Sequence, residues 1–271
     1  MDETRNTIIV EGDAMSARTL ILDLFDTGDP QDFSVAELVR AGAAFGIEAT
    51  GIRTALTRLK SEGRVRPVAR GRYTIGTSAE PLQQRILGWR TRLDGRREWN
   101  GAWLLVIAGP QERADRTIWR RTLRALELEG FTEAETNVWV RPDNLARSAE
   151  GARMRLACLE AAPSLFLFEA CGLDDEREAR FRTLWQSDAL RAAHRRLAED
   201  LGRSAQAVGD MNLAAAAAET LRIGREAIRR IMRDPLLPDE LCPTDALTEL
   251  VEAMTRYDRI GKRMWRAYLA S

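Results

Sequence analysis

Arginine and threonine side chains recur over one short stretch of the sequence, at a spacing that suits contact with nucleic acid. The apolar residues here fall at helical intervals, at Ile52, Ala55, Leu56 and Leu59, which predicts one buried helix face. The opposite face then carries Thr50, Arg53, Thr54, Thr57, Arg58 and Lys60. An arginine can present two donors to a guanine, and a threonine can hydrogen-bond a base or touch a thymine methyl group. The pattern therefore favours a helix that reads base edges in duplex DNA.

A β-hairpin is predicted directly after this helix, which Gly63 would end. Residues 64–68 and 71–75 alternate apolar and polar side chains around a short turn. Basic residues of such a hairpin, or wing, can contact the DNA backbone or the minor groove. The wing would present Arg64, Arg66, Arg70 and Arg72.

The charge of the chain is polarised locally, although its net value is zero, with 41 basic and 41 acidic residues. Residues 53–72 carry seven basic side chains and one acidic one, a net charge of +6. Residues 16–52 carry two basic and six acidic side chains, a net charge of −4. The neutral total excludes nucleic-acid binding over the whole surface, so contact with DNA must be confined to one face.

The elements that must position this face are short helices. Helical periodicity with a good N-cap at Ser16 predicts a first helix to about Asp26. Ser34 and Glu37 form a capping-box pattern that opens a second helix. With the third helix and the hairpin, these elements predict a winged helix-turn-helix DNA-binding domain over residues 16–78, after a flexible tail over residues 1–15.

The remainder of the chain predicts a linker and two further domains. Residues 79–98 are expected to form a basic connecting helix. Strand patterns at 102–108, 137–142 and 164–170 alternate with helical patterns at 113–130 and 146–159. That β-α-β-β-α-β-like order suggests a ferredoxin-like (Cas2-like) middle domain over 99–172. Residues 173–271 read as an all-helical effector and dimerisation domain, interrupted by the proline-rich segment 234–243. The predicted fold class is α+β, multidomain.

Several kinds of chemistry find no support in the sequence. Three widely spaced cysteines and one histidine argue against a disulfide framework, a zinc site or a catalytic triad. No apolar run reaches the roughly 18 residues of a membrane span, and no signal-peptide pattern is present. We therefore expect a cytoplasmic protein without cofactor, metal or catalytic residues.

Single residues that invite a functional interpretation receive a structural one. His194 is followed by Arg195 and Arg196, so an exposed helical position is expected. Trp99 and Trp103 are expected to pack in the middle core. The three cysteines are interpreted as small buried or neutral residues, and the arginine-dense segments 177–196 and 222–233 as solvated helix faces.

The sequence resembles the PaaX-type regulators of phenylacetate degradation. Residues 16–25 are similar to that family's opening helix, 51–63 to its recognition helix, and 70–72 to its wing. Segments 85–86, 99–103 and 138–142 resemble its second domain, and 234–243 its proline-rich C-terminal signature. Two departures occur at that signature. Thr244-Asp-Ala246 stands where the family has tryptophan-proline-glycine, and Arg229–Arg233 stands where a histidine is expected.

The resemblance implies a homodimeric transcriptional repressor that an aryl-acetyl-CoA thioester, such as phenylacetyl-CoA, releases from double-stranded DNA. The two departures leave room for another acyl-CoA or another small molecule, and no effector-binding residue is assigned. The alternatives are an enzyme, either a metal-dependent nuclease or an acyl-CoA-handling protein built on the ferredoxin-like domain, and an adaptor that uses the winged helix for protein contacts. The acid that Cas2-type nucleases place at the end of their first strand is missing from Val106-Ile-Ala-Gly109.

Overall fold

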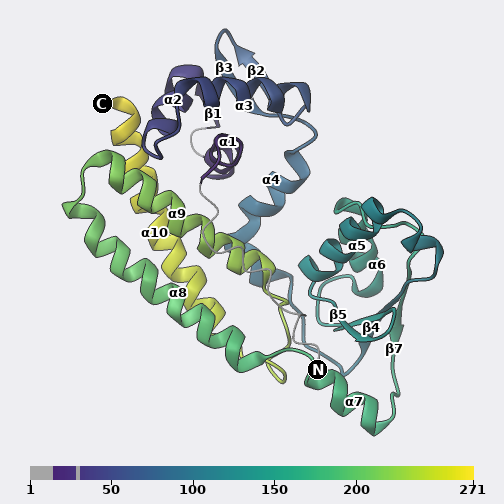
Figure 1. Cartoon of the computed structure of the whole chain (residues 1–271). Helices are drawn as coiled ribbons and strands as arrows, with labels where there is room; N and C mark the ends of the chain where they lie inside the picture. The colour runs from purple at the N-terminus through teal and green to yellow at the C-terminus, as the bar shows by residue number, and fades with distance from the viewer. Residues whose placement is uncertain (1–14, 29–30) are drawn as a thin grey trace, which may run out of the picture.

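The protein has a mixed, mostly helical fold with two small antiparallel sheets (Figure 1). Its structure is a computed structural model that describes residues 15–28 and 31–271. The predicted tail over residues 1–15 falls outside the described part, except for Met15. That side chain is half-buried and packs against the first hydrophobic core.

The N-terminal elements surround one core at one end of the molecule. Capping determines where two helices begin: the Ser16 hydroxyl accepts from the Thr19 amide, and Ser34 and Glu37 complete the predicted capping box. The elements are α1 (Ala17–Asp26), β1 (Asp32–Ser34), α2 (Val35–Ala43), α3 (Ala49–Ser61), β2 (Val65–Ala69) and β3 (Arg72–Ile75). Strand β1 was not predicted, and it pairs with β3 to give a three-stranded sheet in the order β1-β3-β2.

Gly63 ends α3 as the sequence predicts. It adopts a φ of +68°, which an L-residue with a side chain rarely takes. Its amide donates to the Lys60 carbonyl, and the Arg64 amide donates to the Leu59 carbonyl at 2.9 Å. These two bonds satisfy the last carbonyls of the helix and direct the chain into β2.

The predicted connecting helix over residues 79–98 is wrong in its extent. Helix α4 covers Glu80–Leu87, and a 3-10 helix follows over Gly88–Gly95, with non-helical backbone at Thr91. Gly88 takes the C-cap position of α4, and Arg96 continues in an extended conformation. The arginines of this linker turn inward to carboxylates and carbonyls, as described below, instead of forming a solvated basic face.

The middle elements form a four-stranded antiparallel sheet in the order β5-β6-β4-β7. They are β4 (Trp103–Ile107), a 3-10 turn (Gln111–Arg113), α5 (Arg116–Leu128), β5 (Thr132–Glu135), β6 (Val138–Pro142), α6 (Ser148–Cys158) and β7 (Phe166–Ala170). Strand β5 was not predicted. Helices α5 and α6 cover one face of the sheet, and a later helix, α7 (Asp175–Arg182), covers part of the other. Trp99 and Trp103 are buried in the core between the sheet and α7, which confirms the packing role predicted for them.

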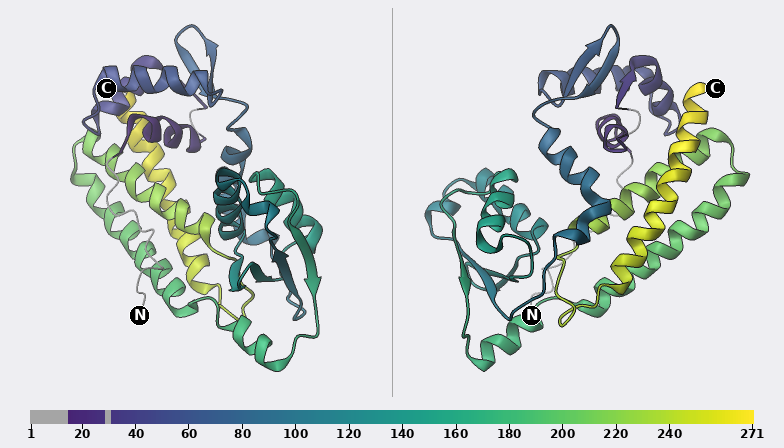
Figure 2. Two further views of the ribbon diagram at one scale, coloured as in Figure 1. Left: turned by 45° about the vertical axis from the view of Figure 1, so that its right-hand side comes forward. Right: turned by 180° about the vertical axis from the view of Figure 1, so that it is seen from behind.

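The C-terminal elements are α7 (Asp175–Arg182), α8 (Ser187–Ala207), a 3-10 turn (Val208–Asp210), α9 (Leu213–Arg233) and α10 (Asp245–Ala270). Helices α8, α9 and α10 run alongside one another and share a core (Figure 2). Helices α9 and α10 also reach the N-terminal core, to which they contribute Ala217, Leu221 and Trp265. Within the described residues, no helix is long and apolar enough to cross a membrane.

Candidate nucleic-acid interface

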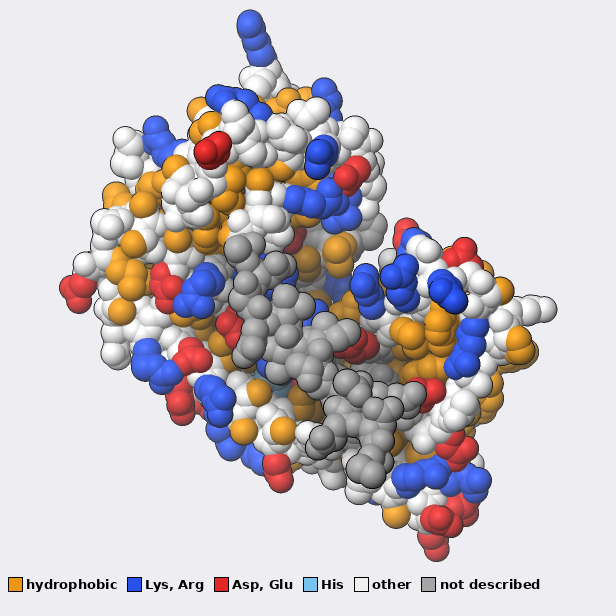
Figure 3. Space-filling model, viewed as in Figure 1, with side chains coloured by type: hydrophobic (Ala, Val, Ile, Leu, Met, Phe, Trp, Pro, Cys, Tyr) orange, Lys and Arg blue, Asp and Glu red, His pale blue; other side chains and the backbone are white. Residues whose placement is uncertain are grey.

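Helix α3 divides its residues between core and solvent as the apolar spacing predicts. Ile52, Leu56 and Leu59 are buried in the N-terminal core. The opposite face is exposed and carries Thr50, Arg53, Thr54, Thr57, Arg58 and Lys60. Helix α3 and the β2–β3 hairpin lie at the outer end of the molecule, where Lys and Arg side chains reach solvent (Figures 1 and 3).

The threonine hydroxyls of this face are partly engaged by the protein itself. The Thr57 hydroxyl donates to the Arg53 carbonyl at 3.0 Å, and the Thr50 hydroxyl donates to Glu48 Oε2 at 3.3 Å. Each hydroxyl oxygen can still accept a hydrogen bond. Arg53, Arg58 and Lys60 are therefore the more available donors of α3.

The four wing arginines are not equivalent. Arg66 and Arg70 are exposed, whereas Arg64 and Arg72 are half-buried. Arg72 Nε donates to Asp32 Oδ1 at 2.6 Å, and its guanidinium lies 3.4 Å from Glu37. The hydrogen bond with Asp32 raises the pKa of Arg72 above its ordinary value. Arg72 thus ties β3 to β1 and to the start of α2, so its expected place on the free basic surface is wrong.

Arg64 also faces the protein. It lies near Asp26 and lowers the pKa of that carboxyl, but burial and the neighbouring Asp23 dominate and raise the pKa of Asp26 to about 7. We use the name basic face for the exposed cationic residues of α3 and the hairpin: Arg53, Arg58, Lys60, Arg66 and Arg70. None of them forms an ion pair with another described residue.

The hairpin tip adds a residue that the sequence did not suggest. Val68 is 47% exposed. It lies where the register of β2 against β3 shifts, between Pro67 and Ala69. An exposed apolar side chain beside Arg70 suits contact with a groove wall. The only local signal was Pro67, because proline in a strand marks an edge or a bulge.

The N-terminal elements are fastened to the C-terminal helices by polar and aromatic contacts. Asp23 Oδ2 lies 2.7 Å from Arg225 Nε of α9. Burial raises the pKa of Asp23 to about 6, and the nearby Arg225 offsets only part of this rise. The Tyr268 hydroxyl donates to the Arg40 carbonyl, and Arg40 donates to the Leu269 carbonyl, both at 2.8 Å. The orientation of the basic face is therefore linked to α9 and α10.

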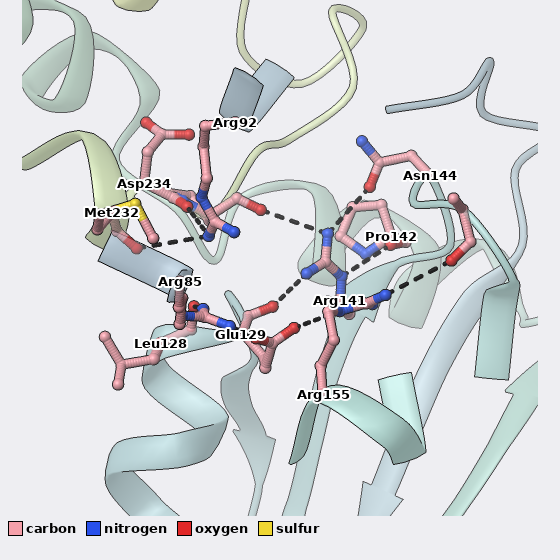
Figure 4. Close-up of polar contacts among 12 residues, drawn as sticks. Arg85, Arg92, Leu128, Glu129, Arg141, Pro142, Asn144, Arg155, Met232 and Asp234 are labelled. Carbon is pink, nitrogen blue, oxygen red and sulfur yellow. Dashed lines mark hydrogen bonds and ion pairs between the residues drawn. The ribbon is translucent and has the colours of Figure 1, made fainter. Parts of the chain in front are cut away.

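A second group of arginines lies in the interior, where the middle sheet meets the proline-rich segment (Figure 4). Arg141 is 1% exposed, and burial lowers its pKa to about 9. Its guanidinium donates to the carbonyls of Glu129, Pro142 and Pro235 and to Asn144 Oδ1. Asn144 in turn donates to the Leu236 carbonyl at 2.7 Å. This network explains how a segment with three prolines stays ordered without being a helix or a strand.

Glu129 is the carboxylate at the centre of this buried group. We call Glu129, Arg85, Arg141, Asn144 and Arg155 together the arginine joint. Glu129 is 2% exposed and lies 2.6 Å from both Arg85 and Arg155. Burial alone would raise its pKa, but the two guanidinium groups lower the pKa below its ordinary value. Gly130 has a φ of +77°, and a Cβ atom there would lie only 2.8 Å from the Pro235 carbonyl oxygen, so glycine allows the proline-rich segment to pack closely. The arginine joint therefore connects α4, the middle sheet and the proline-rich segment.

His194 is buried, so the exposed position expected for it is wrong. It is 2% exposed, and its Nε2 lies 3.3 Å from Asp234 Oδ2. Burial and Arg230 lower the pKa of His194 to about 4, and burial raises the pKa of Asp234 to about 6. The histidine is therefore neutral at pH 7. A histidine does lie beside the proline-rich segment, but α8 supplies it instead of the residues directly before that segment.

The cysteines also differ in part from the prediction. Cys242 is buried, whereas Cys158 and Cys171 are exposed. The described residues contain no group of three or more His, Cys, Asp or Glu side chains placed to hold a metal ion.

Comparison with known proteins supports a regulator. The fold and the basic face are those of a candidate DNA-binding protein, and residues 16–76 match the family model "PaaX-like protein". This match confirms the resemblance for α1 through β3 and suggests a transcriptional regulator. A solved structure, "Uncharacterized protein Rv0674 from Mycobacterium tuberculosis", is similar with a TM-score of 0.63 and 25% identity, covering 94% of this chain and 99% of that one. No curated protein matches the chain.

Proposed function

We propose that this protein is a transcriptional repressor that binds duplex DNA through α3 and the β2–β3 hairpin. The observation that carries the proposal is the basic face, whose five cationic side chains point to solvent without an acidic partner among the described residues. Helix α3 would enter the major groove, where Arg53 and Arg58 reach base edges. The hairpin, with Arg66 and Arg70, would contact the flanking backbone.

The proposal assigns a role to each part of the chain. Residues 16–78 would form the winged helix-turn-helix, and 79–98 the linker. Residues 99–172 would form a ferredoxin-like domain, supported by the strand order β5-β6-β4-β7 and by helices on one face. Residues 173–271 would carry dimerisation and effector response. A homodimer would place two reading helices on half-sites one or more helical turns apart.

The effector follows from the family resemblance. An aryl-acetyl-CoA thioester such as phenylacetyl-CoA, or another acyl-CoA, would favour a dimer geometry in which the two reading helices no longer match the operator spacing. The contacts between α1, α2 and the C-terminal helices support such coupling, because movement of α9 and α10 must displace the basic face.

Fluorescence anisotropy with the DNA upstream of the gene tests the proposal. We expect tight binding by the wild-type chain and a large loss in a variant with Arg53→Gln, Arg58→Gln and Arg70→Gln. Arg116→Gln, Arg120→Gln and Arg124→Gln on α5 provide a control with the same change of charge. Absence of tight binding to this and neighbouring promoters would contradict the repressor proposal. Tight binding that phenylacetyl-CoA leaves unchanged would contradict only the effector assignment.

A further inference from the structure

A cavity of about 390 Å³ lies between the N-terminal elements and the C-terminal helices. Its walls come from α1, β1 and the start of α2 on one side, from α4 and the following 3-10 helix, and from α9 and α10 on the other. A volume of this size falls within the range of small-molecule sites in proteins. The cavity is separate from the basic face and from the arginine joint.

The walls are mainly aromatic and aliphatic. The side chains that line the cavity include Phe33 from β1, Trp89 from the linker, Leu221 and Ile228 from α9, and Trp265 from α10. Two glycines, Gly224 and Gly261, also line it from the middle of α9 and α10. Glycine inside a helix costs about 1 kcal/mol relative to alanine, and here a Cβ atom at Gly224 would contact Met254 of α10 and one at Gly261 would contact Thr220 of α9.

The charged side chains around the cavity balance one another. They comprise four acids and four bases, namely Asp23, Asp26, Glu37, Asp258, Arg225, Arg229, Lys262 and Arg266. Asp23 pairs with Arg225, and Asp258 pairs with both Lys262 and Arg90. Their formal charges sum to zero, so the wall carries no large excess of cations to match the phosphates of coenzyme A and none of anions to match an amine. The raised pKa of Asp26, about 7, removes part of one negative charge near pH 7.

Trp265 contributes to the cavity wall, and its indole nitrogen lacks a hydrogen-bond partner among the described residues. Trp265 is 7% exposed, and its indole Nε1 forms no hydrogen bond with any described group. A buried donor without a partner costs about 1–3 kcal/mol. The indole N–H has almost no solvent-accessible area, so an acceptor on a molecule inside the cavity can reach it only if the Trp265 ring turns.

We propose that this cavity binds an uncharged, largely aromatic or aliphatic small molecule that carries a hydrogen-bond acceptor, such as a carbonyl oxygen, for the indole N–H of Trp265. The apolar walls supply most of the affinity, the balanced charges select against ions, and Trp265 orients the ligand.

The position of the cavity links such a ligand to the basic face. Leu24 of α1 and Phe33 of β1 line the cavity and also belong to the core that holds Ile52 and Leu56 of α3. A ligand that binds between this core and α9 must change the packing, and so the orientation, of the N-terminal elements against the C-terminal helices. This regulatory part rests on the proposed DNA-binding function, whereas ligand binding itself does not.

The neutral fluorophore Prodan is a suitable probe, because it combines a naphthalene ring with a carbonyl oxygen and its emission shifts to the blue in apolar surroundings. We expect saturable binding of one Prodan per full-length chain. Ile228→Trp, which fills the cavity, should weaken binding at least tenfold. Trp265→Phe, which keeps an aromatic ring but removes the N–H, should weaken it about threefold to tenfold.

Matched substitutions outside the cavity control for general effects. Ile118→Trp and Trp119→Phe lie on α5 and should leave Prodan affinity unchanged. Circular dichroism melting checks that each variant folds, and Prodan should raise the Tm of the wild type but not that of Ile228→Trp. Equal Prodan affinity in wild type, Ile228→Trp and Trp265→Phe would overturn the site.

DNA binding is then measured with and without saturating Prodan. A change of at least threefold in the wild type, absent in Ile228→Trp, would support the regulatory link, and an unchanged affinity would overturn it. Failure of the wild type to bind DNA without Prodan would instead refute the proposed function. The fluorescence titration needs no DNA, so the two failures are distinguishable.

Discussion

The basic face and the arginine joint use the same residue type in opposite ways. On the basic face, Arg53, Arg58 and Arg70 point to solvent and contact no carboxylate of the described chain. In the arginine joint, Arg141 is enclosed and donates to three carbonyls and an amide oxygen, while Arg85 and Arg155 hold one carboxylate between them. The first group is available to an outside anion, and the second is committed to the fold.

This difference shows why a count of charges along the chain is a poor guide to function. The linker over residues 79–98 looks as basic as the wing, yet Arg85 and Arg96 bind carboxylates of the protein. Arg72 belongs by sequence to the wing, but partly exposed ion pairs with Asp32 and Glu37 already engage its guanidinium. Availability for DNA depends on which acids the fold brings near, and those acids are distant in sequence.

The largest effect is expected in the arginine joint. Arg141→Met should lower the free energy of unfolding by about 3–5 kcal/mol, because it leaves buried carbonyls without donors and Glu129 with less positive charge nearby. Arg58→Met on the basic face should change it by less than about 0.5 kcal/mol. Urea unfolding of both variants measures the contrast, and equal stabilities would show that the joint is not needed for folding.

A pH-dependent effect of similar size is expected at His194. Its pKa is about 4 in the folded chain and about 6.5 when unfolded. As pH falls from 6.5 to 4, the unfolded chain takes up a proton and the folded chain does not. The wild type should therefore lose up to about 3 kcal/mol of stability relative to His194→Gln over this range.

The comparison of wild type and variant isolates the histidine, because the chain contains only one. Asp234 affects stability in the opposite direction, because its raised pKa of about 6 favours the folded chain at lower pH. The Asp234→Asn variant should therefore lose stability more steeply than the wild type as the pH falls. Thermal unfolding at several pH values gives both differences. A constant difference between wild type and His194→Gln would contradict a buried neutral histidine.

An intermediate effect is expected for base recognition by α3. Arg53→Ala should cost about 1–3 kcal/mol of DNA-binding free energy at the preferred sequence and less at sequences changed at one base pair. Competition binding with a set of single-base variants measures this loss of preference. Equal weakening at every sequence would show that Arg53 contacts a phosphate instead of a base.

The smallest effect separates two neighbours in the wing. Arg70→Ala should reduce the slope of log affinity against log salt by about 1 per chain, because it removes one phosphate contact. Arg72→Ala should leave the slope unchanged, since that guanidinium is held by Asp32 and Glu37. A lower slope in Arg72→Ala would mean that the wing releases this ion pair when it meets DNA.

Local signals in the sequence predicted most of the regular structure. The capping box at Ser34, the helix end at Gly63 and the stripe of Ile52, Leu56 and Leu59 all depend on neighbours within a few residues. Strand β1 has only three residues and forms because β3, about 40 residues later, is available to pair with it. A strand of three residues is too short to show an alternating pattern, so the sequence alone does not predict it.

The errors in the candidate site have the same origin. The position of Arg72 is decided by Asp32, and that of His194 by Asp234, and both partners lie about 40 residues away. Basic neighbours along α8 suggested a solvated histidine, but a helix face is buried or exposed according to the helices packed against it. The register shift beside Val68 depends on how β2 pairs with β3, which alternation within β2 cannot reveal.

The most direct test of DNA binding by the basic face is the salt dependence of affinity for an upstream duplex. If a dimer neutralises roughly 6–10 phosphates, the wild-type affinity should fall about 10³–10⁵-fold between 50 and 200 mM salt. A variant with Arg53, Arg58, Arg66 and Arg70 all replaced by Gln should bind weakly and lose most of that dependence. A wild-type affinity insensitive to salt, or a variant that binds as the wild type does, would contradict the assignment.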